Sequence, residues 1–135
     1  MTTNTQRPQR QPKIVLARET MTRIEALAEG ALQRNPALAD LLLEELNRAK
    51  VVSGDRLRAD IVAIGRPVTY RDETSGQEHT VTLVFPEEAD ISQGKASLMT
   101  PVGVALIGLA VGATFRWTAG DGEARAVTVL SVGEP

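Results

Sequence analysis

The spacing of apolar residues changes once along this chain, and that change limits the fold more than any other feature. Before about residue 50, apolar side chains recur at steps of three and four, as they do on one face of a helix. From Ala59 onwards the pattern is that of strands, and between His79 and Phe85 apolar and polar residues alternate. We therefore expect an α+β protein, with helices first and a sheet second.

Two helices are predicted in the first part of the chain. One spans about residues 20–34 with Thr20 as its N-cap, and the other runs from Pro36 to about residue 50. Pro36 disfavours helical geometry at Asn35 yet suits the first position of a new helix, which Asn35 can cap. So short a connection predicts an antiparallel hairpin, in effect a short coiled coil. With roughly 15 residues per helix and a rise of 1.5 Å per residue, the hairpin would be about 22 Å long.

The second part is predicted to be an antiparallel sheet with one packed helix. Thr100-Pro101 marks the start of that helix, with Thr100 as N-cap, and Gly108 or Gly112 would end it. Residues 51–60 are predicted to be a linker. The predicted strands cover residues 61–64, 68–71, 80–85, 96–99, 113–118 and 126–132. We therefore divide the chain into an arm (1–12), a helical hairpin (13–52) and a sheet domain (53–135).

The amino-acid composition excludes several classes of function. With 15 basic and 17 acidic residues and a net charge of −2, the chain lacks the basic excess of a general nucleic-acid binder. It has no cysteine and a single histidine, His79, so disulfides, the commoner zinc sites and thiolate chemistry are excluded. We expect no metal and no cofactor. No apolar run approaches the roughly 18 residues that span a membrane, so a cytoplasmic protein is expected.

The arm over residues 1–12 is polar and contains two prolines, so we expect it to be disordered. Its only charged residues are Arg7 and Arg10, and Lys13 follows directly. Two interpretations remain open at this point: a solubilising tail, or a weak contact with nucleic acid or an acidic partner.

Residues 86–117, which read PEEADISQGKASLMTPVGVALIGLAVGATFRW, resemble the C-terminal domain of the Gre transcription elongation factors. In that family an acidic EDEADI-like loop precedes a short strand and an SP-x-x-x-AL-x-G motif. Here Thr100-Pro101 replaces Ser-Pro, and Ala105, Leu106 and Gly108 follow. Residues 45–52 are similar to the EL-x-RA-x-V end of the Gre coiled coil. The run from Pro101 to Gly112, and the short apolar opening at residues 14–16, resemble the Rnk branch, the regulators of nucleoside diphosphate kinase.

This resemblance implies a fold, a partner and a contact. The sheet domain would be FKBP-like, and the partner would be RNA polymerase, bound at the rim of its secondary channel. By position in the motif, the contact would involve Met99, Thr100 and Pro101. The protein would be a regulator of transcription and not an enzyme, and we expect a monomer.

The hairpin tip departs from the Gre pattern. Gre factors carry a DLSEN-like tip whose acids help to hold a magnesium ion in the polymerase active site. Here residues 33–38 contain Arg34, Asn35 and Pro36 but no acid, and the nearest carboxylate, Asp40, is expected to support the start of the second helix. Because a hard divalent cation needs carboxylate ligands, we expect no stimulation of transcript cleavage.

Two alternatives remain. An FKBP-like fold could also belong to a peptidyl-prolyl isomerase or another peptide-binding module, although fold alone does not carry function. Such pockets are rich in aromatics, whereas this chain has only Tyr70, Phe85, Phe115 and Trp117. Direct control of nucleoside diphosphate kinase is the other alternative, and no nucleotide-binding motif supports it.

Overall fold

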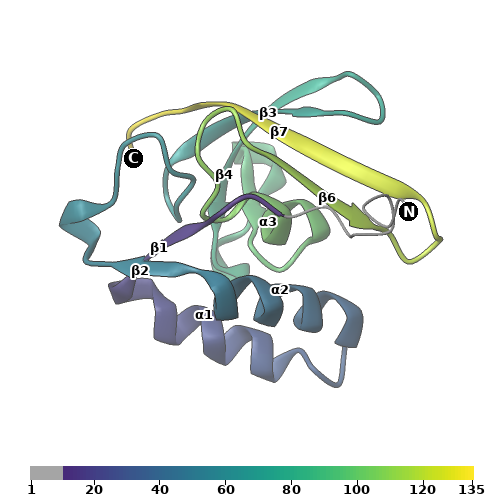
Figure 1. The fold of residues 1–135 in the computed structure, drawn as a ribbon, viewed down its shortest axis with the longest axis horizontal. Helices are drawn as coiled ribbons and strands as arrows, with labels where there is room; N and C mark the ends of the chain where they lie inside the picture. The colour runs from purple at the N-terminus through teal and green to yellow at the C-terminus, as the bar shows by residue number, and fades with distance from the viewer. Residues whose placement is uncertain (1–10) are drawn as a thin grey trace, which may run out of the picture.

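A computed structural model describes residues 11–135, so the arm predicted over residues 1–12 lies almost entirely outside the described residues. The described chain is an α+β protein, as the change of periodicity predicts. Figure 1 shows a curled sheet at the top, α3 beneath it, and α1 and α2 side by side at the bottom. Within residues 11–135, no helix is both long enough and apolar enough to span a membrane.

The two long helices are α1 (Arg18–Gly30) and α2 (Pro36–Arg48), of 13 residues each, or about 20 Å. α2 begins as predicted, with Pro36 in its first turn and the Asn35 side chain accepting a hydrogen bond from the Leu38 amide. The prediction of Thr20 as the N-cap of α1 is wrong. The helix starts two residues earlier because β1 ends directly before it, and the Thr20 hydroxyl donates to the Ala17 carbonyl instead.

Two short strands join the ends of this helix pair. β1 (Val15–Ala17) precedes α1, and β2 (Lys50–Val52) follows α2. They pair in parallel, with Leu16 opposite Val51. The prediction of a linker over residues 51–60 is therefore wrong at its start. After β2 the chain forms the 3-10 turn η2 (Gly54–Arg56).

The main sheet has five strands in the order β5-β4-β3-β7-β6. Three of its pairs are antiparallel, but β5 runs parallel to β4, which corrects the prediction of a purely antiparallel sheet. The chain leaves β4, returns through the turns η3 (Pro86–Glu88) and η4 (Ile91–Gln93), and re-enters beside it. The strands are β3 (Pro67–Asp72), β4 (Glu78–Val84), β5 (Lys95–Ser97), β6 (Thr114–Thr118) and β7 (Ala124–Val132).

The strand predicted over residues 61–64 is not formed. Ile61 makes a single antiparallel bridge with Ala110, and Val62 exchanges backbone hydrogen bonds with Leu109 and Gly108. Both Ile61 and Val62 are buried. The apolar run there marks a buried connection whose backbone is satisfied by the segment after α3 (Pro101–Leu106).

A single buried cluster holds the helix pair against the sheet. Ile24 of α1 and Leu42 of α2 are fully buried, together with Leu98, Leu106 and Phe115 from the second part of the chain. β1 is attached directly to the segment after α3, because the Val15 amide donates to the Gly108 carbonyl at 3.0 Å. The helix pair is thus part of one core with the sheet.

Candidate functional site

The motif at Met99, Thr100 and Pro101 forms a rigid corner between β5 and α3. The Thr100 hydroxyl accepts a hydrogen bond from the Gly103 amide at 3.0 Å and donates to the Ser97 carbonyl at 2.9 Å. The Met99 amide donates to the Ser97 hydroxyl at 3.0 Å. Thr100 is therefore the N-cap of α3 and Pro101 lies in its first turn, as predicted. Met99 and Thr100 are half-buried, whereas Pro101 is exposed.

Gly103 allows this corner to be so tight. A Cβ atom at residue 103 would lie 2.5 Å from the Leu98 carbonyl oxygen and 2.7 Å from that of Ser97. Real Cβ atoms do not approach backbone oxygens so closely, so only glycine fits against the chain that leads into α3. The packing of α3 on its own entry loop thus explains why residue 103 is glycine.

A groove of about 580 Å³ opens beside this corner. Thr100 and Pro101 line it, and so does Asn35 from the turn between α1 and α2. The structure therefore brings two of the three predicted contact residues and one predicted tip residue together at the groove. Met99, Arg34, Pro36 and Asp40 do not line the groove. The rest of its lining is largely apolar and comes from α2, the sheet and α3, including Leu38, Leu41, Val81, Ala96 and Val102.

Four further residues that line this groove were not predicted from the sequence. Tyr70 of β3, Trp117 of β6 and Arg125 of β7 line it, as does Ile91 of η4. Trp117 and Arg125 are directly opposite one another in the β6–β7 pair. Ile91 and Trp117 lie within the 86–117 run but outside the contact motif at residues 99–101, and Tyr70 and Arg125 lie outside that run, so no spacing in the sequence indicated that these residues meet. Burial raises the pKa of Tyr70, and the nearby Asp72 carboxylate adds to that effect.

Asp40 is placed differently from the prediction. It is exposed on α2, and the first turn of that helix contains no acidic residue. Asn35 supplies the capping interaction, so the predicted role of Asp40 at the start of the helix is wrong. The reason is geometric: with Pro36 as the first helical residue, position 40 already belongs to the second turn. Among residues 11–135, no group of three or more His, Asp or Glu side chains is arranged to hold a metal ion.

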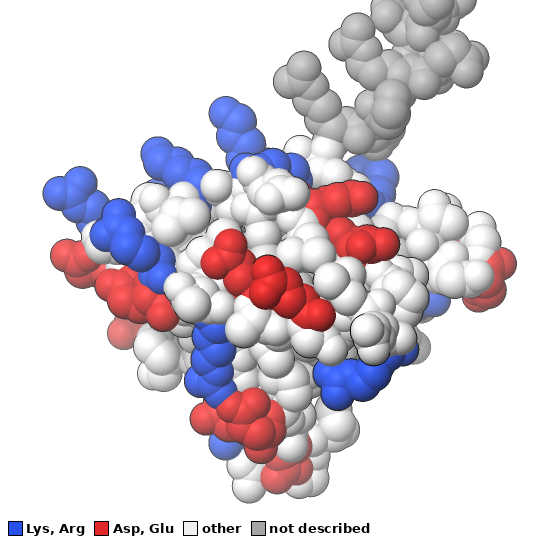
Figure 2. Space-filling model, turned by 90° about the horizontal axis from the view of Figure 1, so that it is seen from below, with Lys and Arg blue, Asp and Glu red and all other residues white. Residues whose placement is uncertain are grey.

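Charges on the helix pair are mixed in sign. Figure 2, which views the molecule from the helix-pair side, shows basic and acidic side chains interspersed over that face. Arg23 of α1 lies over the Phe85 ring, 3.7 Å from its centroid, and pairs with Glu87. This face therefore lacks the continuous basic field that binding to nucleic acid favours.

Glu45 of α2 is the one buried carboxylate among the described residues. Burial raises its pKa, although the hydrogen bond and charge of Arg48 act in the opposite direction. Arg48 also donates to the Pro12 carbonyl. The pair thus anchors the chain just before β1 to the end of α2, and neither residue lines the groove.

Comparison with protein families finds two matches that together cover nearly the whole chain. The model described as "Transcription elongation factor, GreA/GreB, C-term" matches residues 57–134, and the model described as "Rnk N-terminus" matches residues 12–52. The gap between the two matches, residues 53–56, follows β2 directly and contains η2.

Individual relatives give the same result. The regulator of nucleoside diphosphate kinase of Escherichia coli K12 is 33% identical over 121 residues, which cover 90% of this chain and 89% of that protein. Transcription elongation factor GreA of Prosthecochloris aestuarii is 43% identical over 90 residues, or 65% of this chain and 56% of that protein. Among solved structures, a GreA/GreB elongation factor from Nitrosomonas europaea superimposes with a TM-score of 0.67 at 33% identity, over 92% of this chain and all of that one.

Proposed function

Since this chain belongs to the family of Rnk proteins and GreA/GreB transcription elongation factors, we propose that it regulates transcription by binding RNA polymerase at the secondary channel. The observation that supports this most strongly is the groove beside Thr100 and Pro101. The family resemblance predicts a polymerase contact at this motif, and the motif borders a largely apolar groove. Apolar grooves are a common means of binding a segment of a partner protein.

The groove supplies what a docking site needs. Its floor is apolar, and the corner at residues 97–103 is held by hydrogen bonds and close packing, so little order has to be imposed on binding. Pro101 is exposed at its edge and offers a rigid apolar contact. The Asn35 turn of the helix pair forms part of the same wall. A docked segment would therefore touch both parts of the chain.

We further propose that binding does not stimulate transcript cleavage. The turn between α1 and α2 covers residues 31–35 and contains no carboxylate, so it offers no ligands for a divalent cation. Each helix is only about 20 Å long. Asn35, at the end of the turn, lines the groove beside Thr100 and Pro101, so the tip of so short a helix pair lies close to the proposed contact. The protein would occupy the channel entrance and compete with Gre factors for it.

The finer fold assignment is part of the same proposal. One helix, α3, packs against β6 and β7, which supports an FKBP-like architecture for residues 53–135. We propose that this part docks and that the helix pair over residues 13–52 stays fixed to it through the shared core. The active form would be a monomer.

A pull-down with core RNA polymerase tests the docking proposal. We expect binding at micromolar concentration and its loss when a Gre factor is added in excess. Pro101→Ala should weaken binding more than Asn35→Ala does, because Pro101 contacts the partner while Asn35 mainly caps α2. Absence of binding by the wild-type chain would refute the proposal, and equal effects of the two substitutions would refute the contact at Pro101. A transcript-cleavage assay with stalled complexes tests the second proposal, and cleavage above background would contradict it.

A peptidyl-prolyl isomerase is the second candidate, because Tyr70 and Trp117 line the same apolar groove. We expect no catalysed isomerisation of a prolyl test peptide. Isomerisation that disappears in Tyr70→Leu, with the fold retained by circular dichroism, would favour this alternative over the docking function.

A further inference from the structure

Two features of the groove are not explained by the contact at Thr100 and Pro101. The first is Ile91 on its rim, whose side chain is 81% exposed, the most exposed of the large apolar residues in the described chain. Leaving an isoleucine in water forgoes the free energy of its burial. Apolar contact on this side of the groove is therefore available to a partner.

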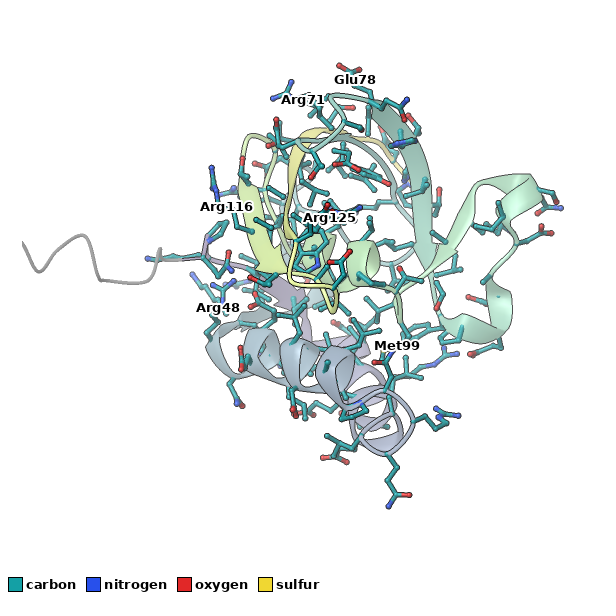
Figure 3. All side chains as sticks on the ribbon, turned by 90° about the vertical axis from the view of Figure 1, so that its right-hand side faces the viewer. Arg48, Arg71, Glu78, Met99, Arg116 and Arg125 are labelled. Atoms are coloured by element: carbon teal, nitrogen blue, oxygen red, sulfur yellow. The ribbon has the colours of Figure 1, made fainter. Side chains whose placement is uncertain are left out.

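The second feature is Arg125, the one charged residue among those that line the groove. Its guanidinium nitrogens lie 3.9 Å from an Asp72 carboxylate oxygen and 4.0 Å from one of Glu123. Both distances exceed that of a hydrogen bond, so the planar donors of Arg125 are not used by these neighbours. Figure 3 shows Arg125 on the sheet above Met99, with Arg116 on the neighbouring strand. A partner could therefore gain charge-assisted hydrogen bonds at Arg125.

We propose that the groove recognises a protein segment in which an apolar side chain is followed closely by a carboxylate. The apolar side chain would lie against Tyr70, Trp117 and Ile91, and the carboxylate would bind Arg125 in a bidentate pair. This inference rests on the proposed docking function and specifies the chemistry of the bound segment. It also makes Arg125 a residue that determines which partner segments are accepted.

The lining favours an acidic protein segment over nucleic acid. Contact with a phosphate backbone needs several cations in a row, whereas this groove has one cation in a largely apolar surface. A basic segment would place like charge beside Arg125, and such a contact costs affinity, although the Asp72 and Glu123 carboxylates, 3.9 and 4.0 Å from the guanidinium, offset part of that cost. An apolar segment without a carboxylate would leave the donors of Arg125 desolvated and unpaired.

Trp117 provides a direct readout, because it is the only tryptophan in the chain and lines the groove. We would titrate the full chain with two amidated ten-residue peptides that carry two leucines and differ at one neighbouring position, glutamate against lysine. The emission of Trp117 should change on binding of the glutamate peptide, with a dissociation constant about five-fold lower than for the lysine peptide. Arg125→Glu should reverse this order. An unchanged order, or binding that leaves Trp117 emission unaltered, would overturn the proposal.

The same variant is then tested on core polymerase. Arg125→Glu should weaken binding by about ten-fold at low salt, the size expected for loss of one close charge pair, and by less at high salt. Arg125→Lys should keep part of the affinity, because the charge remains but the fork geometry is lost. Arg56→Glu is the matched control, since Arg56 is an exposed arginine on η2 that does not line the groove.

Failures of the two proposals are distinguishable. If the wild-type chain does not bind polymerase, the proposed function fails, and the peptide titration alone decides the chemistry of the groove. If the wild-type chain binds polymerase and Arg125→Glu binds equally well, the function stands and the role of Arg125 is refuted. Circular dichroism of each variant shows that the fold is retained.

Discussion

Replacing Gly108 with alanine tests the joint between β1 and the segment after α3. Gly108 has φ +83°, a conformation that costs an L-residue about 1–2 kcal/mol. A Cβ atom there would also lie 2.8 Å from the Ile14 Cβ and 3.1 Å from the Val15 carbonyl oxygen. Forcing an extra methyl group into a packed site costs a further ~1–3 kcal/mol. We therefore expect Gly108→Ala to lower the free energy of unfolding by about 2–5 kcal/mol.

Gly112→Ala is the matched control. Gly112 has φ +91°, but nothing lies within 4 Å of a Cβ built there, so only the backbone cost of about 1–2 kcal/mol applies. Urea unfolding, followed by the emission of Trp117, measures both variants on the same transition. The difference between their free energies of unfolding gives the contribution of the close contact with β1. If Gly108→Ala is no more destabilising than Gly112→Ala, the close packing of β1 does not contribute to stability and the reasoning is wrong.

Three further predictions concern single interactions. Burial raises the pKa of Glu45, so its carboxyl group binds a proton more tightly in the folded state than in the unfolded state. The free energy of unfolding therefore falls as the pH rises from the ordinary glutamate range through the raised pKa. Glu45→Gln should therefore be more stable than the wild type at neutral pH, with the difference closing in acid, and a less stable variant at neutral pH would contradict this. Thr100→Val should lower the free energy of unfolding, measured in urea, by about 1 kcal/mol because α3 loses its N-cap. An unchanged free energy of unfolding would mean that water takes the place of the hydroxyl group. Arg23→Ala should lower the free energy of unfolding by about 0.5–1 kcal/mol through loss of the contact with Phe85. This loss should persist in high salt, where the exposed ion pair with Glu87 is screened. If the loss disappears in high salt, the stabilisation comes from the ion pair instead.

Local chemistry made some elements predictable. At Asn35-Pro36 and Thr100-Pro101, one residue caps the helix and the next has the backbone angle that the first turn requires, so both helix starts follow from two adjacent residues. The start of α1 has no such signal, because Ala17 cannot cap and β1 determines where the helix begins. Thr20 is only the nearest residue of a type that commonly caps helices, and it lies inside α1.

Long-range pairing could not be predicted from the sequence. β1 and β2 have three residues each and pair across the whole helix pair, so neither is long enough to show a pattern of its own. The apolar residues at 61–64 resemble a strand, yet they pair mostly with the segment after α3 and not with a strand. The residues that line the groove could not be predicted for the same reason. Thr100 and Pro101 were identified from their motif, whereas Trp117 and Arg125 meet them only because β6 and β7 curl over α3.

The position of Asn35 couples the length of the helix pair to the shape of the groove. One extra helical turn on both α1 and α2 would carry Asn35 about 5.4 Å further along the helix axis. The groove would then lose part of its wall while the strands at the other end of the pair stayed in place. Insertions between residues 30 and 36 would therefore lengthen the helix pair and reduce the surface that the groove offers to a partner. We therefore expect that a homologue with a longer hairpin forms this groove from other residues, so that insertions at the turn accompany substitutions around Thr100.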